Sequence, residues 1–221
     1  MSEIKEMWKI FLCRPNCILE MRALLPKGSD ALHPKSLVKH FRAMGFQGNR
    51  DALRSAFEQE ALRLNSIGYN VYIVMNPIKP DFPCKAAARD EDIEYRDLLL
   101  IDIDRTSKTQ CPASDAELDA AKKVADDVSE YLSTRGWGDP VQVMSGNGYH
   151  LYYNLRDVPN TPEAKSFCES VLKGLALQFD TPEAKIDISV FNASRITKVP
   201  GTVMRKGDES AERPYRMAVV L

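Results

Sequence analysis

The chain has 221 residues, 44% hydrophobic and 28% charged, a balance typical of a soluble globular protein rather than a disordered or fibrous one. With 30 Lys and Arg against 31 Asp and Glu, the net charge of -1 excludes a global attraction for polyanions, so any nucleic-acid contact must be local. The start lacks the apolar stretch of a secretory signal, and no segment is long enough to cross a bilayer. We therefore expect a cytoplasmic protein with no membrane partner.

The first part of the chain combines strand and helix patterns. Apolar residues at helical spacing, beginning with Leu37 and Phe41, predict helices over residues 36–66 with a break at 45–49. Two segments rich in β-branched and apolar residues predict strands at residues 17–25 and 71–75.

The second part continues this mixture. Ser114 is a candidate N-cap for a helix over 114–134, and Pro162 suits the first turn of another. The Gly-rich turn at 145–148 predicts a hairpin. Strands are expected at residues 98–104, 141–144, 149–154, 186–191 and 215–220. Helices, strands and a hairpin together predict an α+β fold rather than a purely parallel sheet.

Asp102 and Asp104 end an apolar strand, two residues apart, so both carboxylates project from one face. Two like charges at this separation repel, and a divalent cation such as Mg²⁺ relieves the repulsion while also taking phosphate oxygens. Two solvated acids at a strand end are the alternative for an isolated Asp-x-Asp.

The segment from Ser145 to His150 reads Ser-Gly-Asn-Gly-Tyr-His. Gly146 and Gly148 permit a close approach of the backbone to a phosphate, and the serine and histidine offer side-chain donors. Taken alone, the segment is more typical of a structural hairpin.

A third segment begins with Asp187 and continues through Arg195 and Lys198 to a Pro-Gly-Thr turn. The acid is a candidate third metal ligand, and the two cations are candidates for neutralising phosphate charge. Asp180 is a competing acid, but it precedes a Thr-Pro pair in an expected helix-to-strand connection, which favours Asp187.

In this order and spacing, the three segments resemble the archaeo-eukaryotic primase superfamily, and more closely the primase-polymerase domains of plasmid and phage replication proteins. That family has an Asp-x-Asp strand, an S-G-x-G-x-H segment, and a later Asp followed by Arg and a Pro-Gly-Thr-like turn. The resemblance extends to residues 19–24, 71–77, 205–207 and 213–216, and so covers most of the chain.

The resemblance implies one catalytic domain over residues 1–221. Its N-terminal α/β unit, about residues 1–95, would pack against a catalytic unit, about 96–221, with an antiparallel sheet like that of an RNA-recognition motif (RRM). The active site would lie in the cleft between them, near Glu20 and Arg22 if the first strand lines that cleft; a surface ion pair of these two residues is the equal alternative.

The resemblance also implies template-directed nucleotidyl transfer, by a DNA primase or polymerase in replication or repair, with two Mg²⁺ or Mn²⁺ ions. The implied partners are a single-stranded DNA template, a primer strand and NTP or dNTP, with a helicase domain or protein as a possible associate. The ions would be held by Asp102, Asp104 and Asp187. The implied nucleotide-binding residues are Ser145, Gly146, Gly148, His150, Arg195, Lys198 and Lys206.

Alternative readings remain at this stage. A nuclease or glycosyltransferase also uses Asp-x-Asp, and a non-catalytic nucleic-acid-binding module with an RRM-like sheet would expose aromatic residues such as Tyr149, Tyr152 and Tyr153 for base stacking. A structural zinc is not expected, because Cys13 and Cys17 have no second Cys/His pair at a familiar spacing.

Overall fold

Two antiparallel sheets dominate the computed structural model, which describes residues 3–29, 32–107 and 109–221. One has the strand order β2-β1-β3-β8, the other β11-β5-β6-β4-β7, and β9 pairs with β10 alone. The strands are β1 (Ile18–Leu24), β2 (Ser36–Arg42), β3 (Asn70–Val74), β4 (Tyr95–Arg105), β5 (Val141–Met144), β6 (Gly148–Pro159), β7 (Ala184–Ile186), β8 (Ile196–Lys198), β9 (Val203–Met204), β10 (Arg216–Met217) and β11 (Val219–Val220).

The helices begin at the caps that local sequence provides. Asn49 caps α1 (Arg50–Ser66), and Thr161 with Pro162 opens α3 (Pro162–Phe179). Ser114 and Glu117 form a capping box at the start of α2 (Asp115–Ser133), as the sequence predicted for Ser114. Short 3₁₀ segments are η1 (Glu3–Lys9), η2 (Ala43–Phe46) and η3 (Asp90–Asp92). Among the helices of the described residues, none has the length and apolarity that crossing a membrane requires.

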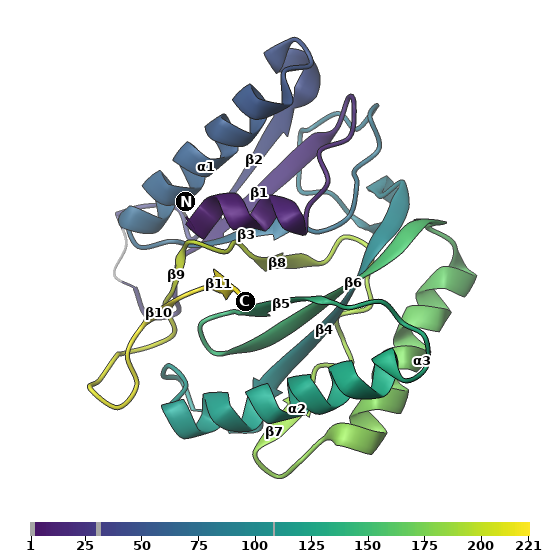
Figure 1. The fold of residues 1–221 in the computed structure, drawn as a ribbon. Helices are drawn as coiled ribbons and strands as arrows, with labels where there is room; N and C mark the ends of the chain where they lie inside the picture. The colour runs from purple at the N-terminus through teal and green to yellow at the C-terminus, as the bar shows by residue number, and fades with distance from the viewer. Residues whose placement is uncertain (1–2, 30–31, 108) are drawn as a thin grey trace.

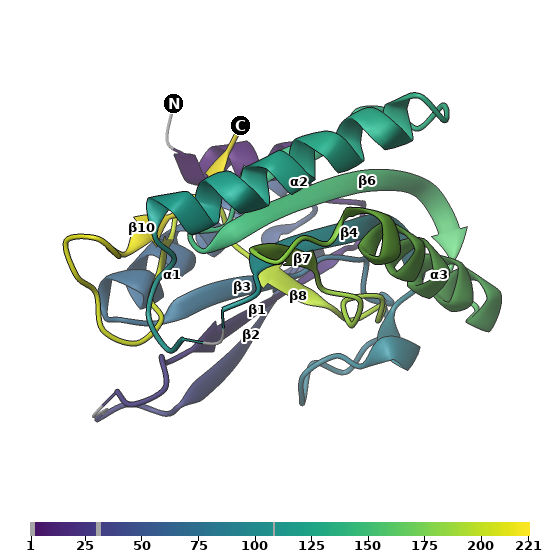
Figure 2. The same cartoon turned by 90° about the horizontal axis from the view of Figure 1, so that it is seen from below.

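Strand β4 is an interior strand of the five-stranded sheet, between β6 and β7. Its residues Leu99, Ile101 and Ile103 are buried in the core, and α2 and α3 contact this sheet. Figure 2 shows the two helices running along the same side of the sheet. Because side chains alternate along a strand, Asp102 and Asp104 must project from the other face, which points toward the four-stranded sheet. Figure 1 shows the two sheets one above the other.

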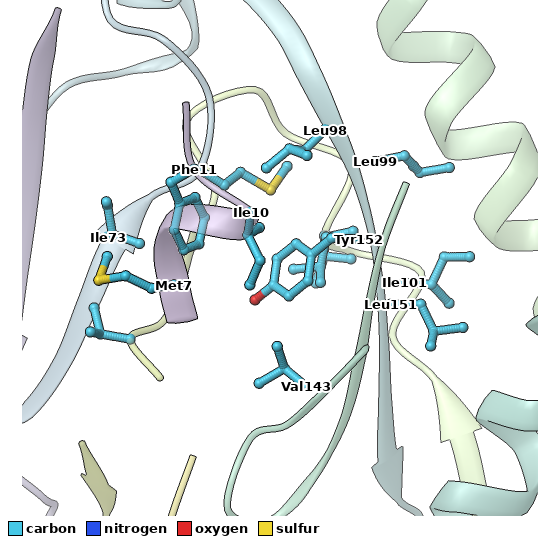
Figure 3. Packing of buried hydrophobic residues seen from close by; sticks show 14 of the residues in the cluster. Met7, Ile10, Phe11, Ile73, Leu98, Leu99, Ile101, Val143, Leu151 and Tyr152 are labelled. Carbon is cyan, nitrogen blue, oxygen red and sulfur yellow. The ribbon is translucent and has the colours of Figure 1, made fainter. Parts of the chain in front are cut away.

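The larger of two apolar clusters joins the two sheets, and the N-terminal segment, η1 and the residues after it, fills the space between them. Figure 3 shows Met7 of η1, and Ile10 and Phe11 just after it, lying between Ile73 of β3 and Tyr152 of β6. The rings of Phe11 and Tyr152 meet edge to face with centroids 5.9 Å apart. The N-terminal segment therefore fixes how one sheet sits against the other.

The chain returns to the first sheet late in the sequence. After β7, it crosses over to form β8, which pairs with β3 in the register Tyr72↔Lys198 and Ile73↔Thr197. The described residues thus form mixed α and β structure with antiparallel sheets, which confirms the predicted α+β class.

Residues 36–42 correct the sequence prediction, because they form strand β2 and not a helix. Leu37 and Phe41 are four residues apart, which is nearly one helical turn but also an even number, so the same spacing places both on one face of a strand. Pairing with β1, in which Leu19 lies opposite Phe41, decides between the two. Helix α1 starts only at Arg50, after the break that the sequence placed at 45–49.

The last two predicted strands are also corrected: of residues 186–191 only Ile186 is in a strand, and residues 215–220 form two short strands. Strand β7 ends at Ile186, because the Asp187 carboxylate accepts a hydrogen bond from the Ser189 backbone at 2.8 Å and turns the chain. The segment 215–220 is split into β10 and β11 at Ala218, whose backbone bonds to Gly201 and Thr202 while the chain changes its pairing partner.

Candidate functional site

Asp102 and Asp104 lie side by side on the exposed face of β4 and opposite strand β6. In the strand register Asp102 faces His150 and Asp104 faces Gly148. A Cβ at position 148 would overlap the carbonyl oxygen of Ile103 and lie 2.8 Å from Asp104 Oδ1. Glycine is therefore needed here because the backbone of β6 passes directly against the second carboxylate.

The surroundings of this acid pair shift the pKa of Asp104. Burial, and then the neighbouring charge of Asp102, raise the pKa of Asp104 to about 7. His150 and Lys206 act in the opposite direction, while Asp187 raises this pKa further. At neutral pH the pair therefore carries less than its full charge, and a cation placed between the carboxylates would restore it.

His150 is held in a buried network behind the acids. Its Nδ1 lies 3.0 Å from the Tyr152 hydroxyl and 3.2 Å from Thr197 Oγ1, and those two hydroxyls are 2.5 Å apart. Its Nε2 lies 3.4 Å from Asp102 Oδ1. Because Tyr152 and Thr197 both engage Nδ1, the ring presents Nε2 to the acidic face.

Asp187 follows β7, the strand on the other side of β4. Its backbone N–H donates to the Asp102 carbonyl oxygen at 2.8 Å, so the backbone of Asp187 lies next to the backbone of Asp102. The carboxylate of Asp180, the competing candidate, accepts a hydrogen bond from the Ile186 backbone at 2.8 Å and belongs to the connection between α3 and β7.

The donor set suits a hard divalent cation only in part. Asp102 and Asp104 supply carboxylate oxygens on one face, the ligand type that Mg²⁺ and Mn²⁺ share with phosphate. Within residues 3–29, 32–107 and 109–221, however, no three His, Cys, Asp or Glu side chains are arranged to hold a metal ion. The acid pair fits such an ion with ligands still to come from a bound substrate.

A pocket of ≈ 620 Å³ opens in front of the acids. Asp102, Asp104, Ser145 and His150 line it from the five-stranded sheet. Its other wall comes from the four-stranded sheet and the segment that follows it, and includes Tyr72, Arg195, Lys198, Arg205 and Lys206. One wall is therefore acidic and the other basic.

Lys198 is the most deeply buried cation of this pocket, with only 2% of its surface exposed. Its Nζ donates to Thr202 Oγ1 at 2.7 Å and to the Val203 carbonyl at 3.1 Å, and among the described residues no carboxylate pairs with it. Burial, and secondarily the charge of Arg205, lower its pKa well below the usual value. An anion entering the pocket would supply the missing counter-charge.

Other donors around the pocket have no acceptor. Among the described residues Asn147 Nδ2, Arg195 Nε and Arg205 Nη1 are buried atoms without a hydrogen-bond partner, and all three residues line the pocket. A buried donor without a partner is costly, so these three donors are available to bind an anion that enters the pocket. Asn147 and Arg205 were not among the residues predicted from the sequence, although they lie in the segments 145–150 and 205–207.

The hairpin residues act mainly through the backbone. Ser145 Oγ donates to the Gly148 carbonyl at 3.1 Å, which closes the turn. Gly146 adopts φ +105°, and a Cβ there would lie 2.5 Å from Met204 Cβ, so this glycine packs against β9 rather than lining the pocket.

Three residues that the sequence analysis did not single out hold the segment between Asp187 and Arg195. Arg96 donates to the Phe191 carbonyl at 2.7 Å, and Asn76 to the Ala193 carbonyl at 2.9 Å. Asp90 accepts from both the backbone and the hydroxyl of Ser194, at 2.9 and 2.7 Å. No local sequence signal marks these partners, because each contact spans about a hundred residues of chain.

Arg195 itself reaches back to this segment. Its Nη2 donates to the Ser189 carbonyl at 2.7 Å, and Ser189 in turn donates its N–H to Asp187. The third acid and the arginine are therefore two ends of one folded loop.

Glu20 and Arg22 form an ion pair with 2.6 Å between Nε and Oε1, but not on the surface. Glu20 is fully buried and also bonds His40 at 2.9 Å and the Ala88 backbone at 2.7 Å. Its contacts tie β1 to β2 and to the loop before η3, and neither residue lines the pocket.

Comparison with known proteins supports this fold. No protein-family model matches the chain, and a search of curated protein sequences finds no match. The polymerase domain of Mycobacterium tuberculosis Ligase D, solved in complex with DNA, is 15% identical with a TM-score of 0.52, over 97% of this chain and 78% of that one. The primase RepB′ is 14% identical with a TM-score of 0.49, over 99% of this chain.

The chain spans 55% of the length of the RepB′ chain that it matches. The fold is similar to that of the Ligase D polymerase domain, which agrees with the fold that the resemblance in sequence predicted.

Proposed function

We propose that this protein is a metal-dependent DNA primase or polymerase that joins nucleotides on a single-stranded DNA template. The observation that carries the proposal is the pocket itself, where a carboxylate pair faces a buried lysine and unpartnered donors. An incoming nucleotide triphosphate with its cation matches both walls at once, because it brings positive charge to the acids and negative charge to the lysine.

In this reaction the 3′ hydroxyl of the growing strand loses its proton and attacks the α-phosphorus, and the bond to pyrophosphate breaks. Asp102 and Asp104 would hold the divalent ions, with Asp187 as the third acid. A bound ion would lower the pKa of the attacking hydroxyl and offset charge on the departing pyrophosphate. Lys198, Arg195 and Lys206 face the triphosphate from the basic wall.

The hairpin residues act in the same proposal as a cradle for phosphate. Ser145 closes the turn, while Gly146 and Gly148 let the hairpin pack against β9 and β4 and so place its other residues. His150 offers Nε2 from a ring that Tyr152 and Thr197 hold in place. Asn147 adds a side-chain donor without a partner in the described structure.

The proposal includes the domain organisation. The five-stranded sheet with two helices serves as the RRM-like catalytic unit, and the part before about residue 95 packs against it across the cleft. Strand β8 crosses back into the first sheet, so the two units work as one domain. The alternative of a base-stacking module is disfavoured, because Tyr152 and Tyr153 are each only 2% exposed.

The direct test is incubation with a single-stranded DNA template, labelled NTPs or dNTPs, and Mg²⁺ or Mn²⁺, with and without a primer. We expect incorporation only with a divalent ion. Incorporation in the presence of EDTA, or none under any of these conditions, would refute the proposal.

A second measurement tests the shared site. Titration calorimetry of Mn²⁺, with and without a non-hydrolysable nucleotide, should show tighter metal binding when nucleotide is present. In Asp187→Asn this coupling should be lost if Asp187 is the third ligand, and retained if Asp180 or no third acid takes part.

A further inference from the structure

The loop that leads from β3 to η3 is held by side chains and not by backbone pairing. Residues 79–89 contain no helix or strand. Within the described part of the chain, residues 83–88 form no backbone–backbone hydrogen bond. Ala88, near the end of this loop, is nevertheless only 3% exposed. Buried backbone groups need partners, so side chains from elsewhere in the fold must supply them.

Glu20 and Arg22 of β1 supply both partners. The Glu20 carboxylate accepts a hydrogen bond from the Ala88 N–H, and Arg22 Nη2 donates to the Ala88 carbonyl oxygen, each at 2.7 Å. Arg22 Nε also donates to Glu20 Oε1 at 2.6 Å, and His40 Nε2 lies 2.9 Å from Glu20 Oε2. We call the Glu20 and Arg22 side chains the Ala88 clamp. Because its hydrogen bonds involve charged groups and Glu20 is fully buried, the clamp fixes this point of the loop firmly.

The clamp lies on the side of the four-stranded sheet that faces the pocket. Arg22 is opposite Tyr72 in the strand register, and Tyr72 is opposite Lys198. Directly opposite residues project from the same face of a sheet, and both Tyr72 and Lys198 line the pocket. The clamp therefore holds the loop on the face of the basic wall, although neither of its side chains lines the pocket.

The loop continues from the clamp to the acid that holds the segment before Arg195. Asp90 follows two residues after Ala88, and its carboxylate accepts from both the N–H and the hydroxyl of Ser194. Ser194 directly precedes Arg195, which in turn is bonded to the loop that begins at Asp187. Strand β1 is thus connected, through residues 88–90, to the loop that carries the third acid and the arginine.

We propose that Glu20 and Arg22 are positioning residues of the site, which determine where the loop 187–195 lies by clamping Ala88. The inference rests on the proposed function, in which Asp187 is the third acid and Arg195 faces the triphosphate. Neither positioning residue contacts the ligands. Loosening the clamp should therefore lower the affinity of the site for metal and nucleotide and leave the reaction of the saturated site nearly unchanged. An ion pair that only stabilises the fold would alter neither affinity.

Arg22→Ala tests the inference, because it removes half of the clamp at a side chain that is 21% exposed. Lys39→Ala is the matched control: this β2 residue is paired with Glu60, and its register with Met21 places it on the other face of the same sheet. Primer extension gives the apparent KM for nucleotide, the Mn²⁺ concentration for half-maximal incorporation, and kcat at saturation of both. Thermal unfolding defines a temperature at which each variant is folded.

We expect Arg22→Ala to raise the KM and the Mn²⁺ requirement about fivefold each, with kcat within about twofold, because a lost hydrogen bond changes an equilibrium by such a factor. Arg22→Lys keeps the charge but loses the planar fork, so it should show a smaller rise in the same two quantities. Lys39→Ala should match the original protein in all three. An unchanged KM and Mn²⁺ requirement in Arg22→Ala would overturn the proposal, even if its melting temperature falls.

A double-mutant cycle with Asp90→Asn tests the route. If the clamp acts through Asp90, Arg22→Ala should raise the Mn²⁺ requirement by less than about twofold once Asp90 is already replaced. Fully additive effects of the two substitutions would overturn this route.

Hydrogen exchange followed by mass spectrometry separates the inference from the proposed function, because it needs no activity. Arg22→Ala should speed exchange in residues 83–92 and 188–195 but not in the hairpin at 145–150. Faster exchange in 83–92 alone would overturn the proposal. If the protein incorporates no nucleotide but both segments exchange faster, the function fails and the clamp stands. If incorporation occurs and Arg22→Ala changes neither the KM nor the Mn²⁺ requirement, the function stands and the inference fails.

Discussion

The two walls of the pocket solve opposite electrostatic problems. The five-stranded sheet presents Asp102 and Asp104, and burial together with their mutual repulsion raises the pKa of Asp104 to about 7. The four-stranded sheet presents Lys198, and burial lowers its pKa. In the absence of a ligand, these shifts favour the neutral form of Asp104 on one wall and the neutral form of Lys198 on the other. A cation bound to a polyphosphate would return both walls to their charged forms, so the walls are complementary to that ligand rather than to each other.

The largest effect is expected from removing the acidic wall. Asp102→Ala should reduce nucleotide incorporation more than about a hundredfold, because the proposed ion contributes several kcal/mol to the transition state. Incorporation is measured by primer extension with Mn²⁺. Asp126→Ala, which removes an exposed carboxylate paired with Lys122 on α2, is the control and should retain activity. Equal activity in the two variants would contradict the assignment of the catalytic metal ions to the acidic wall.

Removing the basic wall should act on nucleotide affinity. Lys198→Met should raise the apparent KM for nucleotide roughly 10- to 100-fold, since hydrogen bonds to charged groups contribute about 1.5–3 kcal/mol. Lys173→Met, at an exposed lysine paired with Glu169 on α3, is the control for loss of a charge. A fall in kcat with unchanged KM would contradict the assignment of this wall to ground-state nucleotide binding.

The same substitution has a pH signature in stability. Because the pKa of Lys198 is lowered in the folded protein, the unfolded chain binds more protons between that pKa and the ordinary value of 10.5. The free energy of unfolding should therefore rise with pH across this window, and Lys198→Met should flatten the rise. Urea denaturation at several alkaline pH values measures it.

The acidic wall was predictable from sequence to a greater extent than the basic one. The motif of Asp102 and Asp104 lies in one short apolar strand, and alternation alone places both on one face. Position 198 needs β8 to pair with β3 across more than a hundred residues, and no local pattern indicates that partner. The error at 36–42 has the same origin, because only pairing with β1 decides between helix and strand there.

For the site residues too, local patterns were predictable from the sequence and long-range contacts were not. The sequence motifs singled out the acids, the hairpin and the arginine, but not the contacts that hold them. Asn76, Asp90 and Arg96 fix the segment from 191 to 194 through bonds between distant parts of the chain. Such partners are determined by tertiary packing and become visible only in the folded structure.

These contacts predict a smaller effect that links the two walls. Asp90→Asn should weaken the bonds to Ser194 and raise the Mn²⁺ concentration needed for half-maximal incorporation about five- to tenfold, because Asp187 and Arg195 would be less firmly placed. Asp92→Asn is the matched control, since among the described residues its carboxylate bonds only the backbone of Arg89, which directly precedes η3. A loss of thermal stability with an unchanged metal requirement would show that Asp90 is structural only.

The smallest effect concerns the stability of the metal-free protein. The pKa of Asp104 is raised from 3.8 to about 7 by burial and by Asp102, so the folded protein binds more protons than the unfolded chain between these values. Its free energy of unfolding should consequently fall as pH rises from about 4 to 7, the opposite sign to Lys198. Asp104→Asn should remove this fall and stabilise the protein at pH 8 by on the order of 1–2 kcal/mol. Urea denaturation in EDTA at pH 5 and pH 8 measures both. If Asp104→Asn is no more stable than the original protein at pH 8, the repulsion between the two carboxylates does not destabilise the metal-free protein. The argument that a cation is needed to offset this repulsion would then be wrong.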